Sequence, residues 1–223
     1  MTEKLVIFDC DGVLVDSELI SLGLLIEYCS KYDVQVSLEE ACEIFLGKPV
    51  NDSASEVNRI MGTSVPDVDI DLFQEQIFER FDKELNAVEG VIKALEQIDY
   101  PVCVASSSNL SRIQLSLRKT GLDKFFTKYL FSTDMVARGK PHPDVFLYAC
   151  ERMNVHPKDA IVIEDSPAGL MAAKAAGIKT IAFAGGVHAE QAKLIEKLLP
   201  LSPDILIHNM MELPPLIESL LME

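Results

Sequence analysis

Short apolar runs of strand length lie in two parts of the chain, one at the start and the others after Gly90. The first run leads into Asp9 and Asp11, and Gly12 follows directly. The later runs alternate with segments whose apolar residues recur at helical spacing. This alternation predicts a doubly wound, parallel-sheet (Rossmann-like) α/β fold. The strands are expected within 5–14 and at 102–105, 129–131, 160–163, 179–183 and 204–207.

The segment between these two parts shows helical patterns only. Asp16 or Ser17 can cap the first of its helices, because a short polar side chain there can accept a backbone N–H bond. Ser37 and Glu40 have the spacing of a capping box, which predicts the start of a second helix. We expect helices from 18 to about 31, from 37 to about 46, and at about 51–61 and 69–86.

The helical segment divides the chain into two expected domains. Residues 17–88 are predicted to form an all-helical cap, inserted into an α/β core of residues 1–16 and 89–223. Within the core, Ser166 and Pro167 are expected to cap and begin a helix. Other core helices are expected to end at about Gly121 and Gly177 and to cover about 143–153, 189–199 and 211–222.

Polar side chains follow three of the predicted strands at the point where each strand ends. They are Asp9 and Asp11 after the first strand, Ser106 after the second, and Glu164 and Asp165 after the fourth. The carboxyl ends of parallel strands meet at one edge of the sheet, where α/β proteins bind ligands. The cap leaves the sheet at the same edge, so it can act as a lid over these side chains.

The carboxylates predict a metal-dependent site. Two acids at the end of a buried strand cannot be left unpaired without a large cost, and the alternating pair Asp9 and Asp11 lies on one side of an extended backbone. One of them can attack a substrate while the other moves protons. Glu164 and Asp165 supply the hard oxygen ligands that Mg²⁺ prefers. We therefore expect Mg²⁺ at this edge of the sheet.

Lys140 is a candidate for the cation that faces these acids. It stands between Gly139 and Pro141, which restrict the backbone around it. A fixed lysine beside clustered carboxylates can neutralise them and hold a phosphoryl oxygen. The histidines give no comparable signal: His142 suits the start of a helix, and the others stand alone at His156, His188 and His208.

Composition and charge exclude several classes of partner. The chain is 48% hydrophobic and 25% charged, with no apolar run long enough for a membrane helix, so we expect a soluble cytoplasmic protein. Its net charge of −15 argues against binding to nucleic acid or an anionic membrane. Residues 17–88 carry 15 acidic and 5 basic residues, whereas residues 112–140 carry 7 basic and 2 acidic. An anionic substrate should therefore meet the second stretch, and the acidic cap favours a monomer.

The cysteines predict a reducing compartment and no disulfide framework. Their number is odd, their spacing is wide, and most have apolar neighbours. They are expected to be buried thiols at Cys10, Cys29, Cys42, Cys103 and Cys150.

Taken in order, these motifs resemble those of the haloacid dehalogenase superfamily, in its helical-cap phosphatase and β-phosphoglucomutase-like branch. The family's D-x-D-G-[TV] motif is matched from Asp9 to Val13, and its three later motifs are matched by Ser106, Lys140 and the Glu164–Asp165 pair. The resemblance covers essentially the whole chain. It implies phosphoryl transfer rather than dehalogenation, because the dehalogenases lack the second acid of the first motif.

The resemblance also implies a role for each motif residue. Asp9 would be the nucleophile that forms an aspartyl-phosphate, and Asp11 would be the general acid and then the general base. The groups expected to hold the substrate phosphoryl oxygens are Ser106, Ser107 and Lys140. The Mg²⁺ ligands would be Asp9, the backbone carbonyl of Asp11, and Asp165 with help from Glu164.

Two departures from the β-phosphoglucomutase pattern favour a phosphatase over a mutase. Those mutases carry a histidine where this chain has Ser21, and an arginine in the cap specificity loop at about Val50. Here that loop would contain Gly47 and Lys48, and it could instead be a simple helix connection. We predict a Mg²⁺-dependent phosphatase of a small phosphorylated metabolite, such as a hexose phosphate or phosphogluconate. A sugar-phosphate mutase and a catalytically silent binding module are the alternatives.

Overall fold

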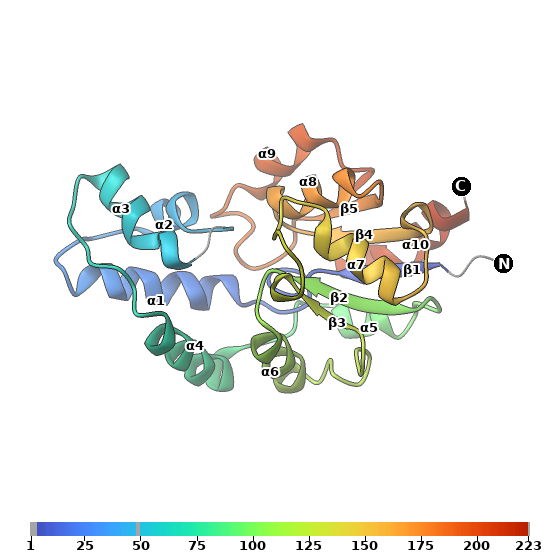
Figure 1. The fold of residues 1–223 in the computed structure, drawn as a ribbon, viewed down its shortest axis with the longest axis horizontal. Helices are drawn as coiled ribbons and strands as arrows, with labels where there is room; N and C mark the ends of the chain where they lie inside the picture. Colours follow the sequence, from blue (N-terminus) through green and yellow to red (C-terminus); the bar gives the residue numbers. More distant parts are fainter. Residues whose placement is uncertain (1–3, 48–49, 223) are drawn as a thin grey trace.

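The computed structural model describes residues 4–47 and 50–222, and within them six strands form one parallel sheet. The strand order is β3-β2-β1-β4-β5-β6, which places β1 in the centre (Figure 1). This confirms the doubly wound fold expected from the alternation of strands and helices. The strands are β1 Leu5–Phe8, β2 Val102–Ser106, β3 Leu130–Ser132, β4 Ala160–Glu164, β5 Lys179–Phe183 and β6 Ile205–Ile207.

Burial on both faces explains why the central strands are continuous apolar runs. In β1, Leu5 and Ile7 pack into the hydrophobic cluster shared with α7 (Asp144–Arg152), whereas Val6 and Phe8 pack into the larger cluster on the opposite face. Parallel sheets have both faces covered by helices, so every position of such a strand is apolar. The remaining core helices are α5 Val91–Leu95, α6 Leu110–Thr120, α8 Pro167–Ala175, α9 Leu194–Leu198 and α10 Leu213–Met222.

A group of four helices separates β1 from α5, as the periodicity predicted. Figure 1 shows them at the end of the molecule away from the two termini. The two chain segments that join this cap to the core run side by side: the Asp16 N–H donates to the Asn86 carbonyl, and the Val88 N–H to the Leu14 carbonyl, both at 3.0 Å. The cap helices are α1 Glu18–Ser30, α2 Leu38–Ile44, α3 Ser53–Met61 and α4 Ile70–Glu84. We propose residues 17–88 as the extent of this domain.

Local capping follows the sequence in two places and departs from it in a third. Ser37 and Glu40 form the predicted capping box, and the Ser166 hydroxyl accepts from the Gly169 N–H at 3.0 Å. The prediction that a side chain caps α1 was wrong. Ser17 occupies the N-cap position without a capping bond, because its hydroxyl donates to the Asp11 carboxylate at 2.5 Å.

The helix predicted at 189–199 is much shorter in the structure. Only Leu194–Leu198 are α-helical, and the residue before them, Lys193, has a left-handed backbone with φ +51°. That conformation interrupts helical geometry, so the preceding residues form turns. One of these turns carries His188.

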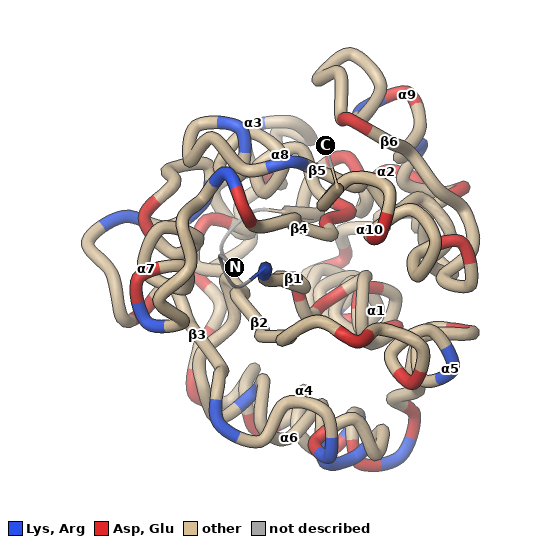
Figure 2. The backbone as a smooth tube through the Cα atoms, turned by 90° about the vertical axis from the view of Figure 1, so that its right-hand side faces the viewer, with Lys and Arg blue, Asp and Glu red and all other residues tan. Residues whose placement is uncertain are grey.

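The remaining expectations concern membrane helices, cysteines and charge. In the part of the chain that the structure describes, no helix is both long and apolar enough to cross a membrane. All five cysteines are buried free thiols, as predicted. Figure 2 shows acidic and basic positions distributed over the whole backbone, with several basic positions along α6 and around α7.

Replacement of the central aromatic side chain of β1 tests this packing. Phe8 is fully buried, and its ring packs edge-on against the Phe126 ring with the two ring centroids 5.9 Å apart. We expect Phe8→Ala to lower the free energy of unfolding by about 3–5 kcal/mol, because it leaves a cavity in the core. Urea unfolding measures this loss. The control Leu72→Ala, at a cap position that is 49% exposed, should change stability by less than about 0.5 kcal/mol.

Candidate active site

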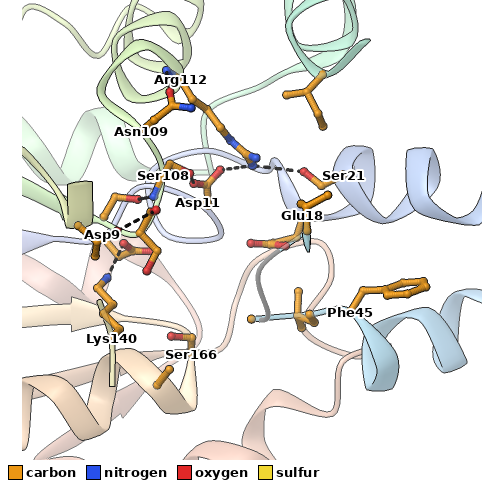
Figure 3. Close-up of a pocket in the computed structure, with 18 of the residues that line it drawn as sticks. Asp9, Asp11, Glu18, Ser21, Phe45, Ser108, Asn109, Arg112, Lys140 and Ser166 are labelled. Atoms are coloured by element: carbon orange, nitrogen blue, oxygen red, sulfur yellow. Dashed lines mark hydrogen bonds and ion pairs between the residues drawn. The ribbon is translucent and has the colours of Figure 1, made fainter. Parts of the chain in front are cut away.

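A cavity of about 520 Å³ lies where the carboxyl ends of the strands face the cap. Its core side carries the predicted residues from three strand ends together with Lys140 (Figure 3). Its cap side comes mainly from α1, α4 and the residues that follow α2. The core residues brought together are Asp9, Asp11, Ser106, Ser107, Lys140, Glu164 and Asp165.

Lys140 lies at the floor of the cavity with its ammonium group surrounded by oxygen atoms. Its Nζ donates to Asp9 Oδ1 at 2.7 Å, to Glu164 Oε1 at 2.6 Å and to the Ala105 carbonyl at 3.0 Å. The lysine side chain is only 3% exposed. Burial alone would lower the pKa of Lys140, but the two adjacent carboxylates raise it above its usual value. Lys140 is therefore a fixed positive charge.

Three carboxylates lie close together here, and Lys140 donates to two of them, Asp9 and Glu164. Asp9, Glu164 and Asp165 each offer an oxygen atom within 4.8 Å of the others. Burial, together with the neighbouring carboxylates, raises the pKa values of Asp9 and Asp165 well above normal, and Lys140 only partly opposes this. Such a cluster lacks positive charge, and its oxygen donors are those that hard divalent cations prefer. The residues present therefore fit a bound Mg²⁺.

The contacts of Glu164 distinguish it from the other two acids. Oε1 accepts from Lys140, and Oε2 accepts from the Ser166 N–H at 2.9 Å and from the Ser166 hydroxyl at 2.8 Å. Gly169 makes room for this arrangement, because a Cβ there would lie 1.8 Å from Glu164 Oε1. Both carboxylate oxygens of Glu164 are thus already paired, which leaves Asp9 and Asp165 as the better candidates for direct metal ligands.

Asp11 lies in a different environment from Asp9. Its carboxylate accepts bonds from the hydroxyls of Ser17 at 2.5 Å and Ser108 at 2.6 Å, and from Arg112 Nη2 at 2.8 Å. Burial raises the pKa of Asp11, but Arg112 and the hydroxyl donors lower it by more, so the net shift is downward. Asp9 and Asp11 therefore differ in their hydrogen-bond partners, and their pKa values shift in opposite directions.

Sequence reasoning did not single out Ser108, Arg112 or Ser17 as site residues. Arg112 begins the basic stretch noted in the sequence, and Ser108 belongs to the serine run after β2. Their contacts depend on the position of α6, whose N-cap residue Asn109 accepts from the Arg112 N–H at 2.9 Å. In Figure 3, Arg112 extends from this helix toward both Asp11 and Ser21.

The serines after β2 differ in their surroundings. Ser106 is buried, and its hydroxyl accepts from the Ser108 N–H at 3.1 Å. The Ser107 carbonyl accepts from the Thr133 hydroxyl at 3.1 Å, which ties the loop to the residues after β3. Both serines line the cavity, as expected for groups that meet a substrate.

The cap side of the cavity combines a few polar groups with an apolar wall. Glu18 projects into the space between Asp11 and Phe45 (Figure 3). Burial, with Asp11 and Asp165 adding to it, raises the pKa of Glu18 to about 8. Gly47 also lines the cavity, whereas Lys48, the other residue predicted for the specificity loop, lies outside the described residues.

His188 is a further residue that the sequence did not connect with the site. It is buried, and its Nε2 lies 3.1 Å from Asp165 Oδ2. No spacing pattern predicts this contact, because the two residues lie on loops after different strands, β4 and β5.

Comparison with known proteins agrees with this combination of fold and site. The family model described as haloacid dehalogenase-like hydrolase matches residues 6–183. The 6-phosphogluconate phosphatase of Escherichia coli is 30% identical over 184 residues, which are 82% of this chain and 83% of that protein. A phosphorylated carbohydrates phosphatase of Thermotoga maritima is 31% identical over 183 residues, which are 79% of this chain and 82% of that protein.

A solved structure extends the similarity to the cap. It is a haloacid dehalogenase-like protein of unknown function from Agrobacterium tumefaciens, with a TM-score of 0.86 and 32% identity, and the match covers 97% of this chain and 98% of that one. The chain therefore belongs to the haloacid dehalogenase-like hydrolases. Both of the named relatives are phosphatases of phosphorylated compounds.

Removal of the central lysine tests the charge balance of the cluster. We expect Lys140→Met to lower the free energy of unfolding by about 3–5 kcal/mol near pH 8, because buried carboxylates lose their partner. The folded pKa of Asp9 is already raised by burial and rises further above its unfolded value without the lysine, so the loss should shrink as the pH falls toward about 5 and the acid takes up a proton.

Urea unfolding at the two pH values, with a chelator present, measures this dependence. Lys119→Met is the matched control, because Lys119 pairs with the exposed Asp82 at 3.1 Å and its loss should be small at both pH values. If the loss of unfolding free energy in Lys140→Met stays constant or grows toward acid pH, Lys140 is not the charge partner of the buried carboxylates.

Proposed function

We propose that the protein is a Mg²⁺-dependent phosphomonoesterase that works through a phosphoryl group on Asp9. The observation that carries the proposal is the placement of the Asp9 carboxylate at the cavity floor, 2.7 Å from the buried Lys140 ammonium. A carboxylate fixed beside a cation can attack phosphorus while the cation attracts the phosphoryl oxygens. Both groups line the cavity at the carboxyl edge of the sheet, where the proposed substrate would bind.

The first half of the reaction forms one bond and breaks another. An oxygen of Asp9 attacks the phosphorus of a phosphate monoester, and the bond from phosphorus to the substrate oxygen breaks. Lys140 and the Ser106 hydroxyl bind the non-bridging oxygens, with Ser107 beside them. Asp11 gives a proton to the leaving alcohol. In the second half, Asp11 removes a proton from water, which attacks phosphorus and releases inorganic phosphate from Asp9.

The contacts of Asp11 set a condition for this proton transfer. A protonated Asp11 can donate to Ser17 or Ser108, because a hydroxyl can rotate from donor to acceptor. Arg112 donates to Asp11 Oδ1, which still accepts when the proton is on Oδ2, although the bond then loses the strength that the negative charge of the carboxylate gives it. Substrate entry beside Arg112 is the step that can change this bond.

The Mg²⁺ ion would be held by Asp9, Asp165 and the backbone carbonyl of Asp11, with Glu164 orienting the neighbouring groups. When bound, it supplies positive charge that offsets the negative phosphoryl oxygens and the carboxylates. This agrees with the shortage of cations in the acid cluster.

We propose a sugar or sugar-acid phosphate as the substrate. Two relatives are named for such compounds, 6-phosphogluconate and phosphorylated carbohydrates. On the cap side, Glu18, Ser21 and Gln74 line the cavity and can hydrogen-bond to hydroxyl groups. Gly47 and Lys48 remain the proposed specificity loop. Action on a small molecule as a monomer in the cytoplasm, without nucleic acid or membrane, also remains a prediction from the sequence.

Substitution of the proposed nucleophile is the first test. Asp9→Asn should lower the rate of Mg²⁺-dependent phosphate release by at least about a thousandfold, because an amide cannot form the phosphoryl intermediate. A colorimetric phosphate assay measures the rate. The control Asp99→Asn, at an exposed position of the α/β core domain, should retain the parent rate. Substantial activity of Asp9→Asn would exclude Asp9 as the nucleophile.

Product analysis separates a phosphatase from a mutase. Ser21 lines the cavity next to Arg112 Nη2, at 3.2 Å, but a serine cannot take the part of an imidazole in proton transfer at neutral pH. We expect one free phosphate for each molecule consumed with hexose 6-phosphates and 6-phosphogluconate. Conversion of hexose 1-phosphate to its isomer without phosphate release would favour the mutase instead, and no turnover despite Mg²⁺ binding would indicate a silent binding module.

A further inference from the structure

His188 lies directly behind one of the proposed metal ligands. It is 1% exposed, and its Nε2 is 3.1 Å from Asp165 Oδ2. Strands β4 and β5 are paired neighbours in the sheet, so the loops that follow them emerge side by side. The loop after β5 carries the imidazole against the carboxylate, on the side of Asp165 that Gly12 also contacts.

Two glycines hold this pair tightly. A Cβ on Gly12 would lie 1.8 Å from Asp165 Oδ2 and 3.1 Å from His188 Cε1. A Cβ on Gly186 would lie 3.0 Å from His188 Nδ1 and 3.2 Å from the Gly12 carbonyl. The backbone therefore contacts the imidazole and the carboxylate closely, and neither can move far without displacing a neighbouring segment.

The imidazole has one evident partner for its proton. Both ring nitrogens are buried, and neither makes a hydrogen bond of good geometry as the ring lies, but Nε2 is within 3.1 Å of Asp165 Oδ2. A neutral imidazole carries one N–H, on either of its two nitrogens. A proton on Nε2 faces the Asp165 carboxylate at 3.1 Å, and a small rotation of the ring is enough for this N–H to donate to Oδ2.

We propose that His188 is a positioning residue that orients Asp165 toward the divalent cation. The proposal rests on the Mg²⁺ site of the proposed function and goes beyond it. An N–H that holds one carboxylate oxygen fixes the rotation of the side chain and leaves the other oxygen for the metal. Outer groups of this kind commonly change metal affinity 10–100-fold when they are removed.

A pair of amide variants isolates the role of the Nε2 proton. His188→Gln can place an N–H near the position of Nε2, whereas His188→Asn carries the same amide on a shorter side chain that reaches only the position of Nδ1. The control is His156→Asn, since His156 is exposed and precedes β4 at the opposite edge of the sheet.

The readout is the dissociation constant for metal, measured without turnover. Isothermal titration of the metal-free protein with Mg²⁺, and electron paramagnetic resonance of free Mn²⁺ in a parallel series, both report it. We expect His188→Asn to bind about 10–100-fold more weakly than the parent, and His188→Gln and His156→Asn to stay within about threefold. Circular dichroism melting curves check that each variant is folded.

The outcomes are distinct. Unchanged affinity in His188→Asn, or a tenfold loss in His188→Gln, would overturn the positioning role, and the second result decides the matter even if His188→Asn does not fold. A parent protein that binds no divalent cation would contradict both the proposed metal site and the role of His188. Binding by the parent without phosphatase activity would contradict only the proposed function.

Discussion

The structure depends on the compensation of negative charge at the carboxyl edge of the sheet. Asp9, Glu164 and Asp165 are buried within a few ångströms of one another, and one lysine, Lys140, donates to two of them. Buried carboxylates without partners are strongly disfavoured. The shape of the surrounding loops follows from this constraint. Gly12 and Gly169 have no Cβ where the carboxylates of Asp165 and Glu164 must fit.

The same constraint places the two acids of the first motif in different environments. Asp9 shares a lysine with Glu164 and lies among buried carboxylates, so its environment favours a bound cation. Asp11 is held by Arg112 and by the hydroxyls of Ser17 and Ser108. Ser108 belongs to the core, whereas Ser17 directly precedes the first cap helix. Arg112 also donates to Ser21 of the cap at 3.2 Å, so one side chain contacts both Asp11 and the cap. Exposed ion pairs join the two domains elsewhere, for example Lys193 with Glu39 at 2.7 Å.

Much of the fold and part of the site could be predicted because the signals are local. Strands and helices follow from apolar periodicity, and the end of each strand places Asp9, Ser106 and Glu164 at one edge. The contacts of Arg112 and His188 could not be predicted, because they depend on how α6 and the loop after β5 pack against the first loop. The predicted N-capping bond from Ser17 does not form for a related reason. The Ser17 hydroxyl donates to the nearby Asp11 carboxylate instead of accepting a backbone N–H at the start of α1.

The central claim is that Asp9 carries the phosphoryl group during turnover. The most direct measurement is rapid acid quenching of the enzyme with an accepted substrate whose phosphoryl group is radiolabelled, followed by peptide fragmentation. The account predicts a transient protein-bound label that hydroxylamine releases and that maps to Asp9. Release of labelled phosphate with no bound label at any quench time, or a label on another residue, would contradict it.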